Sequence, residues 1–214
     1  MLETPSLPIQ FDTWFKSRNW QPHSHQLALI ELAASGNSTL LIAPTGGGKT
    51  LAGFLPSLIE LAGNGAKPKP GLHTLYISPL KALSVDVARN LEIPANEMGL
   101  PISIETRTGD TPQTKRQRQR RNTPNILLTT PESLALLLSY PDAPTIFRNL
   151  KAVIVDELHA LADNKRGEML ALSLSRLTTL APNHRRVGLS ATVKYPDALA
   201  RWLSKTAGKN DDVV

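Results

Sequence analysis

Short apolar runs alternate along this chain with longer helical segments. The apolar runs predict six strands, in chain order: Ser38–Ala43, Thr74–Ser78, Ile102–Thr106, Asn125–Thr129, Ala152–Asp156 and Arg186–Ser190. The segments between them predict seven helices: His25–Ser35, Lys49–Leu61, Leu80–Met98, Thr114–Arg121, Pro131–Leu138, Gly167–Leu180 and Pro196–Lys205. Such alternation is typical of a parallel sheet covered on both faces. The expected fold is a three-layer α/β domain with a mainly parallel sheet flanked by helices.

The ends of the chain differ from this regular middle part. Residues 1–20 place several aromatic side chains among polar residues, which predicts an N-terminal flap packed on the body: Phe11, Trp14, Phe15 and Trp20. Residues 21–207 carry the alternating elements and are expected to form one domain. Residues 208–214 are mostly polar and predict a frayed tail or a linker.

Composition narrows the class of protein. The chain has 214 residues, of which 41% are apolar and 20% charged, as in globular domains. A net charge of +6 favours a polyanionic partner such as nucleic acid, although an ordinary surface excess of Lys and Arg explains it equally well. The absence of cysteine excludes disulfides and cysteine nucleophiles. Without a secretory signal or an apolar stretch of about 18–20 residues, we expect a cytoplasmic protein with no membrane partner.

The segment Ala43–Thr50 reads Ala-Pro-Thr-Gly-Gly-Gly-Lys-Thr between a predicted strand and a predicted helix. Glycine lets the backbone approach a phosphate closely, and the helix N-terminus adds partial positive charge. Lys49 is expected to reach the β- and γ-phosphates, and the Thr50 hydroxyl to bind Mg²⁺. A chance glycine turn is the alternative, and the strand–loop–helix setting disfavours it. The expected nucleotide-binding residues are Thr45, Gly46, Gly47, Gly48, Lys49 and Thr50.

Two carboxylates, Asp156 and Glu157, follow the apolar run Val153–Val155. Open α/β sheets bind ligands at the carboxyl ends of their strands. We expect Asp156 to hold Mg²⁺ and Glu157 to orient and deprotonate an attacking water. A solvated acidic strand end is the alternative. Together with Lys49, the pair predicts a catalytic site that uses ATP and Mg²⁺.

Further motifs give this chain its family resemblance. Asp156-Glu157-Leu158-His159 resembles the DExH box of superfamily-two helicases, and Ser190-Ala191-Thr192 resembles the motif that follows it. Three more segments resemble helicase motifs in the same order: Ser78–Leu83, Thr108–Thr111 and Thr129–Leu134. The likeness runs from about Trp14 to Thr192, although Ala43 stands where the phosphate loop usually begins with glycine. The chain looks most like the large helicase-related group, including its bacterial ligase-associated DExH branch, whose lobes have a RecA-like P-loop NTPase fold.

The resemblance also implies roles for single residues. Gln26, 23 residues before Lys49, matches the glutamine that reads adenine, and its amide offers both a donor and an acceptor. An upstream aromatic often stacks on the base, and either Trp20 or Phe15 fits. The residues expected to link nucleotide state to nucleic-acid grip are His159, Ser190 and Thr192. Helix capping is the alternative for the two hydroxyl residues.

The resemblance places nucleic-acid contacts at three strand ends: Pro79, Lys81, Thr108, Gly109, Thr130 and Pro131. Hydroxyls and helix N-termini there suit phosphates and do not read base sequence. Taken singly, each is only a turn with a helix cap. The basic run 115–121 either holds the same backbone or is a solvated helix face. DNA is favoured over RNA, but these backbone contacts leave that choice open.

Helicases of this group use a second RecA-like lobe, which supplies the arginines that reach the γ-phosphate. Only 22 residues follow Thr192 here, against about 150 for a lobe. We therefore expect the first motor lobe of an ATP-dependent DNA helicase or translocase, of 3′-to-5′ polarity in this family and nearly inactive alone. The alternatives are an RNA-directed DExH helicase and a nucleotide-gated binding module without turnover. A small-molecule kinase is disfavoured by the DExH box and by Ser190-Ala191-Thr192.

Overall fold

The computed structural model describes residues 7–44, 46–63, 68–204 and 212–214, without the side chains of residues 81–83 and 85. Its strands form one parallel sheet in the order β3-β4-β2-β5-β6-β1-β7. Their bounds are β1 Thr39–Ile42, β2 Thr74–Ile77, β3 Ile104–Arg107, β4 Ile126–Thr129, β5 Ala152–Val155, β6 Arg185–Ser190 and β7 Asp212–Val213. The predicted three-layer α/β fold is confirmed.

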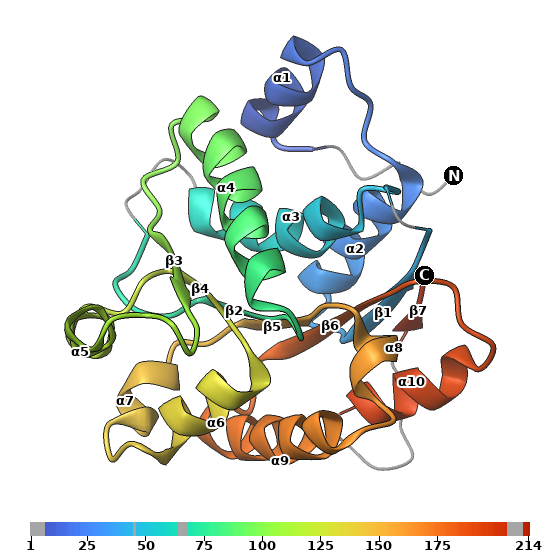
Figure 1. Ribbon diagram of the computed structural model, residues 1–214. Helices are drawn as coiled ribbons and strands as arrows, with labels where there is room; N and C mark the ends of the chain where they lie inside the picture. The colour runs from blue at the N-terminus through green and yellow to red at the C-terminus, as the bar shows by residue number, and fades with distance from the viewer. Residues whose placement is uncertain (1–6, 45, 64–67, 205–211) are drawn as a thin grey trace.

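Helices cover both faces of this sheet (Figure 1). One face carries α1 Ile9–Ser17, α2 Ser24–Ala34, α3 Lys49–Ala62 and α4 Lys81–Glu97. The other carries α6 Pro131–Ser139, α7 Ala143–Phe147, α9 Lys165–Leu180 and α10 Pro196–Leu203, while α5 Gln113–Arg121 lies beside β3 and α8 Leu158–Leu161 follows β5. None of the described helices is long and apolar enough to span a bilayer.

The core is split into two apolar clusters by the sheet itself. Successive side chains of a strand point to opposite faces. Leu127 accordingly joins the cluster beneath α6 and α9, whereas Ile126 and Leu128 join the cluster beneath α3 and α4. Every residue of β2, β4 and β5 is buried. Burial on both faces explains why these strands read as unbroken apolar runs rather than alternating patterns.

The strand register aligns the points where the chain leaves the sheet. Ile42 pairs with Ser190, and Ile77 pairs with both Val155 and Thr129. Arg107 pairs with Thr129 at the far side. All pairings are parallel, so the segments that follow these residues emerge along one edge of the sheet. The functional motifs expected from the sequence lie in those segments.

The six predicted strands are present, each with ends within two residues of the expected positions. Three helices, α1, α7 and α8, were not predicted. Because α7 and α8 have only five and four residues, they are too short for a helical period to reveal. Helix α1 lies in the predicted flap, where Trp14 donates from Nε1 to Glu97 Oε2 at 2.7 Å. The described part of the flap thus packs on the end of α4.

The polar tail also differs from expectation at its very end. Asp212 and Val213 form β7, and the Val214 N–H donates to the Leu40 carbonyl at 2.9 Å. Residues 205–211 lie outside the described part of the chain. Strand β7 pairs with the outer side of β1, where unpaired backbone groups would otherwise face away from the sheet. That pairing depends on a distant strand, so the composition of the tail did not reveal it.

Candidate nucleotide and nucleic-acid site

The phosphate loop connects β1 to α3, as the sequence predicted. Gly46 and Gly48 have φ values of 84° and 72°, in the left-handed region that glycine adopts most readily. Lys49 begins α3 and is 9% exposed, with Nζ donating to the carbonyls of Ala43 at 2.7 Å and Pro44 at 3.0 Å. An ammonium carries three N–H donors, so a third can go to a phosphate. Thr45 lies outside the described residues.

Gln26 lies against this loop from the first turn of α2. Its side chain is 2% exposed, and its Oε1 accepts the His23 N–H at 2.9 Å, which caps the helix. A Cβ atom placed on Gly48 would stand 3.1 Å from Gln26 Nε2. The glutamine expected to read adenine therefore adjoins the phosphate loop, with its amide nitrogen nearest to it.

The two candidate stacking aromatics differ sharply in exposure. Phe15 is 3% exposed and packs in the core, whereas Trp20 is 50% exposed. Trp20 lines a cavity of about 480 Å³ together with Thr50 and residues of α4. Of these two aromatics, Trp20 is therefore the one with an accessible ring next to the start of α3.

Asp156 is held by two donors at the end of β5. It is 4% exposed, and its Oδ2 accepts the Tyr76 hydroxyl at 2.5 Å while its Oδ1 accepts the Glu157 N–H at 2.8 Å. Burial, and then the Asp156 charge, raise the pKa of Tyr76, so the hydroxyl stays protonated and donates. Sequence reasoning missed Tyr76. The available signal was a tyrosine in a buried strand, whose hydroxyl needs a partner.

Glu157 has an uncommon backbone conformation. Its φ of 48° and ψ of 44° lie in the left-handed region, which costs a non-glycine residue about 1–3 kcal/mol. The residue turns the chain from β5 into α8. Such strain is typical of functional sites, where the surrounding structure holds it. The conformation agrees with a catalytic position for this carboxylate.

His159 joins the end of β5 to the end of β6. Its Nδ1 accepts the Ala191 N–H at 3.3 Å and lies 3.2 Å from Ser190 Oγ. The accepted bond leaves the proton on Nε2, which lies 3.3 Å from Glu157 Oε2 and can donate to it. The structure therefore brings His159 and Ser190 together, as the coupling hypothesis requires, while Thr192 is exposed.

The three predicted nucleic-acid turns follow β2, β3 and β4 at the same edge. Thr130 is 3% exposed, and its Oγ1 accepts the Ser133 N–H at 3.4 Å as the cap of α6. Pro131 is also buried, Thr108 is 7% exposed and Gly109 is exposed. The Thr130 side chain thus caps α6, and a contact of this residue with nucleic acid would have to come from its backbone.

Arg166, a residue that the sequence did not single out, ties two of these turns together. Its guanidinium pairs with both carboxylate oxygens of Glu132, at 2.5 and 3.1 Å, and donates to the Pro79 carbonyl at 2.8 Å. It lies at the start of α9. No local pattern marks it, because its partners lie 34 and 87 residues away in the chain.

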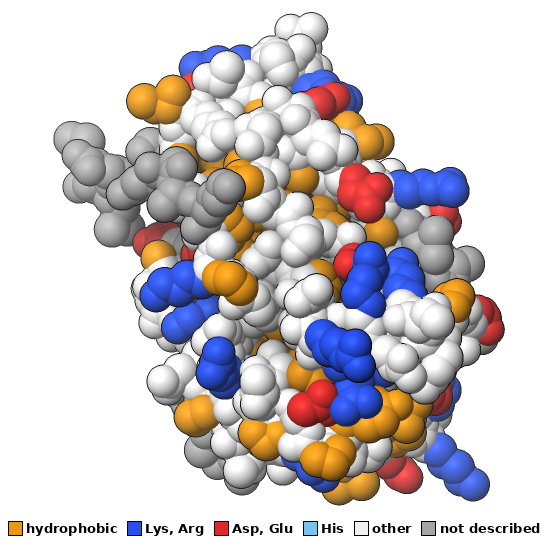
Figure 2. Space-filling model, turned by 90° about the vertical axis from the view of Figure 1, so that its left-hand side faces the viewer, with side chains coloured by type: hydrophobic (Ala, Val, Ile, Leu, Met, Phe, Trp, Pro, Cys, Tyr) orange, Lys and Arg blue, Asp and Glu red, His pale blue; other side chains and the backbone are white. Residues whose placement is uncertain are grey.

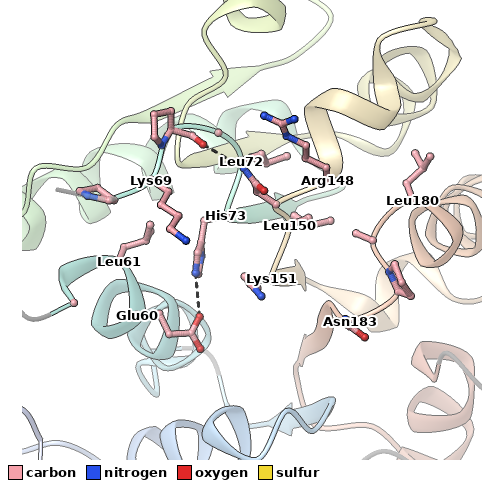
Figure 3. A pocket seen from close by; sticks show the side chains of 17 residues that line it. Glu60, Leu61, Lys69, Leu72, His73, Arg148, Leu150, Lys151, Leu180 and Asn183 are labelled. Carbon is pink, nitrogen blue, oxygen red and sulfur yellow. Dashed lines mark hydrogen bonds and ion pairs between the residues drawn. The ribbon is translucent and has the colours of Figure 1, made fainter. Parts of the chain in front are cut away.

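A separate cavity of about 510 Å³ opens at the opposite edge, where β2, β5 and β6 begin (Figure 3). Glu60 lies there with His73, whose Nε2 is 3.1 Å from Glu60 Oε2. Ligands of open α/β sheets bind at the carboxyl ends of strands. This cavity is therefore distinct from the candidate nucleotide site.

Comparison with known proteins agrees with this geometry. The family model for the DEAD/DEAH box helicase matches residues 23–199. The chain is 46% identical over 205 residues to a Lhr helicase and probable uracil glycosylase of Mycolicibacterium smegmatis, and 43% identical over 207 residues to the Lhr helicase/uracil glycosylase of Escherichia coli. These alignments cover 91% and 89% of this chain but only 14% and 13% of the relatives.

A solved structure extends the likeness to three dimensions. It is that of the Mycobacterium smegmatis helicase Lhr bound to ssDNA and AMP-PNP, with a TM-score of 0.85 and 43% identity, covering 97% of this chain and 28% of that one. The predicted resemblance to the large helicase-related group is confirmed. The chain belongs to the DEAD/DEAH box helicase family.

Proposed function

We propose that this chain is the first motor lobe of an ATP-dependent DNA helicase or translocase, which binds Mg-ATP and the backbone of a single nucleic-acid strand. The observation that carries the proposal is the shared edge of the sheet, where the phosphate loop, the DExH box and three helix-starting turns follow strands in register. The likeness to a helicase solved with ssDNA and AMP-PNP favours DNA over RNA and ATP as the nucleotide.

In the proposed nucleotide site, backbone N–H groups of the loop and the Lys49 ammonium hold the phosphates. The loop residues concerned are Thr45, Gly46, Gly47 and Gly48, and Gln26 reads the adenine. Thr50 and Asp156 suit Mg²⁺, because hydroxyl and carboxylate oxygens are hard ligands and each Asp156 oxygen keeps a lone pair beyond its one hydrogen bond. The ion, when bound, neutralises charge that develops on the phosphates.

Glu157 acts as the base in this proposal, orienting the attacking water and accepting its proton. The His159 Nε2–H next to Glu157 Oε2 fixes one carboxylate oxygen, which leaves the other for water. Since His159 also contacts Ser190 and the Ala191 N–H at the end of β6, a change at Glu157 would reach this segment, and Thr192 would follow through the backbone that it shares with Ser190. The contacts from Glu157 through His159 to the end of β6 would link nucleotide state to the hold on nucleic acid.

The strand of nucleic acid follows the three turns at the sheet edge. The proposed contacts are Pro79, Lys81, Thr108, Gly109, Thr130 and Pro131, all addressing the sugar–phosphate backbone. A second RecA-like lobe of the same full-length protein would supply the arginines that reach the γ-phosphate. The cytoplasmic location expected from the sequence belongs to the same proposal.

The test compares ATP hydrolysis by the full-length protein with length-matched single-stranded DNA and RNA. We expect DNA to stimulate hydrolysis at least about tenfold more than RNA. Glu157→Gln should lower turnover by at least about 100-fold and leave the affinity for a fluorescent ATP analogue unchanged, because it removes a general base and no phosphate contact. Glu168→Gln, at an exposed acid of α9, is the matched control.

Two results would contradict the proposal. Equal or stronger stimulation by RNA would favour an RNA-directed DExH helicase. Full turnover by Glu157→Gln would remove that carboxylate from the role of base.

A further inference from the structure

Three of the five basic side chains of α5, Arg116, Arg118 and Arg120, have partners elsewhere in the protein. Figure 2 views the side of the molecule that carries α5, and its Lys and Arg side chains lie in separate groups, several beside Asp or Glu. Arg118 pairs with Glu105 at 2.6 Å. Arg120 pairs with Asp142 at 2.9 Å and lies 4.0 Å from the centre of the Tyr140 ring. Much of this charge is therefore engaged within the protein.

Arg116 has a different set of partners, all of them backbone carbonyls. Its Nε donates to the Thr111 carbonyl at 2.8 Å, and its Nη2 donates to the carbonyls of Thr108 at 3.0 Å and Gly109 at 2.5 Å. These residues form the β-turn after β3, in which the Thr111 N–H also donates to the Thr108 carbonyl at 3.2 Å. One guanidinium thus holds three of the turn's carbonyls, a geometry that a planar fork of donors suits.

This arrangement fixes the direction of an amide. In a planar trans peptide, the carbonyl of one residue and the N–H of the next point in opposite directions. Because Arg116 holds the Thr108 carbonyl, the Gly109 N–H points away from the guanidinium. Gly109 is exposed. The turn therefore presents an oriented backbone donor, of the kind that binds phosphate without reading bases.

The helix that carries Arg116 is itself fixed to the sheet. Arg107, at the end of β3, is 1% exposed and donates from Nη1 to the Arg116 carbonyl at 3.0 Å. Gln119, on the same face of α5, donates to the Thr106 carbonyl at 3.0 Å. The backbone of Arg116 is thus held to the strand that leads into the turn, and its side chain reaches over that turn.

We propose that Arg116 is a positioning residue, which holds the 108–111 turn so that the Gly109 N–H meets a nucleic-acid phosphate. The inference rests on the proposed function, since it needs nucleic acid at this edge of the sheet. It assigns the arginine a task inside the protein, rather than a direct contact with the strand.

The first experiment measures binding of a fluorescein-labelled dT 12-mer by fluorescence anisotropy at several salt concentrations. Arg116→Ala should weaken binding at least about tenfold with little change in the salt dependence, because the Gly109 N–H carries no net charge. A direct contact of Arg116 with a phosphate would instead flatten the slope of log affinity against log salt by about 0.7 for a single strand. Arg121→Ala, which removes the same charge from an exposed position of α5, should weaken binding less than about twofold. Affinity for a fluorescent ATP analogue should be unchanged in both. Equal losses of DNA affinity in Arg116→Ala and Arg121→Ala would overturn the proposal, because the loss would then depend on the net charge of the protein and not on the position of the arginine.

The second experiment observes the amide directly. Selective ¹⁵N labelling of the 13 glycines gives few signals, and Gly109→Ala identifies the one that matters. The Gly109 signal should shift on adding the 12-mer to wild type and to Arg121→Ala, and stay in place in Arg116→Ala. If Arg116→Ala unfolds at a temperature more than about 10 °C below that of wild type, Arg116→Lys replaces it. We expect Arg116→Lys to bind the 12-mer more weakly than wild type and Arg121→Ala do, but with less than a tenfold loss of affinity.

The outcomes separate the two proposals. If wild type binds the 12-mer and the Gly109 signal does not move, the role of Arg116 is wrong and the proposed function stands. If wild type shows no binding at any salt concentration, the proposed nucleic-acid edge itself is wrong.

Discussion

At the scale of single residues, the candidate site depends on groups that orient other groups. Asp156 is fixed through both carboxylate oxygens, by Tyr76 and by the Glu157 backbone. Glu157 is in turn next to the Nε2–H of His159. Restricting these side chains before ligand binds reduces the entropy lost on forming the complex. A single substitution, Tyr76→Phe, can remove the hydroxyl that donates to Asp156.

Tyr76→Phe is expected to lower the free energy of unfolding by about 1–3 kcal/mol, since it deletes a buried hydrogen bond to a charged acceptor. The ring stacked on Phe54, with centroids 5.2 Å apart, is retained. Urea unfolding measures the change, and titration of Mg²⁺ with a fluorescent ATP analogue should show weaker metal dependence. Tyr140→Phe, at a partly exposed ring, is the control. Unchanged stability together with unchanged Mg²⁺ dependence would show that the Tyr76 hydroxyl does not orient Asp156.

At the scale of elements, the two edges of the sheet have different chemistry. The carboxyl ends carry the nucleotide loop and the turns held by Arg116 and Arg166. The amino ends carry an ionic cluster in which Glu60 of α3 pairs with His73 at 3.1 Å and with Arg185 at 2.7 Å. This cluster joins α3 to the starts of β2 and β6 beside the cavity of Figure 3. It stabilises the sheet away from the site.

The cluster predicts a pH dependence of stability. Burial raises the pKa of Glu60, but the His73 hydrogen bond and the Arg185 charge outweigh it, so the pKa in the folded protein lies below the ordinary 4.5. A lowered carboxyl pKa gives stability that is complete above the pKa of the unfolded state and is lost as pH falls through the lower pKa of the folded state. The stability difference between wild type and Glu60→Gln should therefore be largest above about pH 5.5 and shrink toward pH 3.

Thermal unfolding of both proteins from pH 3 to pH 7 measures this difference. Glu31→Gln, at an exposed position of α2, is the matched control and should show no such trend. A difference that grows as pH falls would have the wrong sign and would rule out the ion pairs as its cause.

At the scale of the whole molecule, the chain forms one RecA-like lobe and spans 14% of the length of a close relative. Its candidate site lies on an open sheet edge. Arginines that reach the γ-phosphate are worth about 10³–10⁵ in turnover in related phosphoryl-transfer systems. Arg185 and Arg186 do not fill this role, because both lie at the start of β6, and Arg185 pairs with Glu60.

The 214-residue chain is therefore expected to bind Mg-ATP weakly and to hydrolyse it at least about 10³-fold more slowly than the full-length protein. Fusing the second lobe should restore DNA-stimulated turnover, which separates a motor from a nucleotide-gated binding module. Steady-state ATP hydrolysis with and without single-stranded DNA is the measurement. Hydrolysis by the chain alone at the full-length rate would contradict the need for a second lobe.

The sequence by itself determined the parts of this protein that depend on local order. The strand–loop–helix around Lys49 and the carboxylates after Val155 were predictable, because a strand end, its turn and the next residues stay neighbours in any fold. Six of the seven strands of the parallel sheet followed from apolar runs, and three of them, β2, β4 and β5, are buried throughout. Parallel strands end at a common edge of the sheet, so the order of strands and loops in the sequence was enough to predict a nucleotide site at that edge.

The tertiary structure alone decided which side chains hold that edge in shape. Tyr76 meets Asp156 across 80 residues, and Arg166 meets the Pro79 carbonyl across 87. Arg116 is only eight residues from Thr108, yet it lay within a basic run that reads as a nucleic-acid contact or a solvated face. Periodicity reports which face of an element is buried, and it carries no information about which carbonyl a long, flexible guanidinium finally reaches.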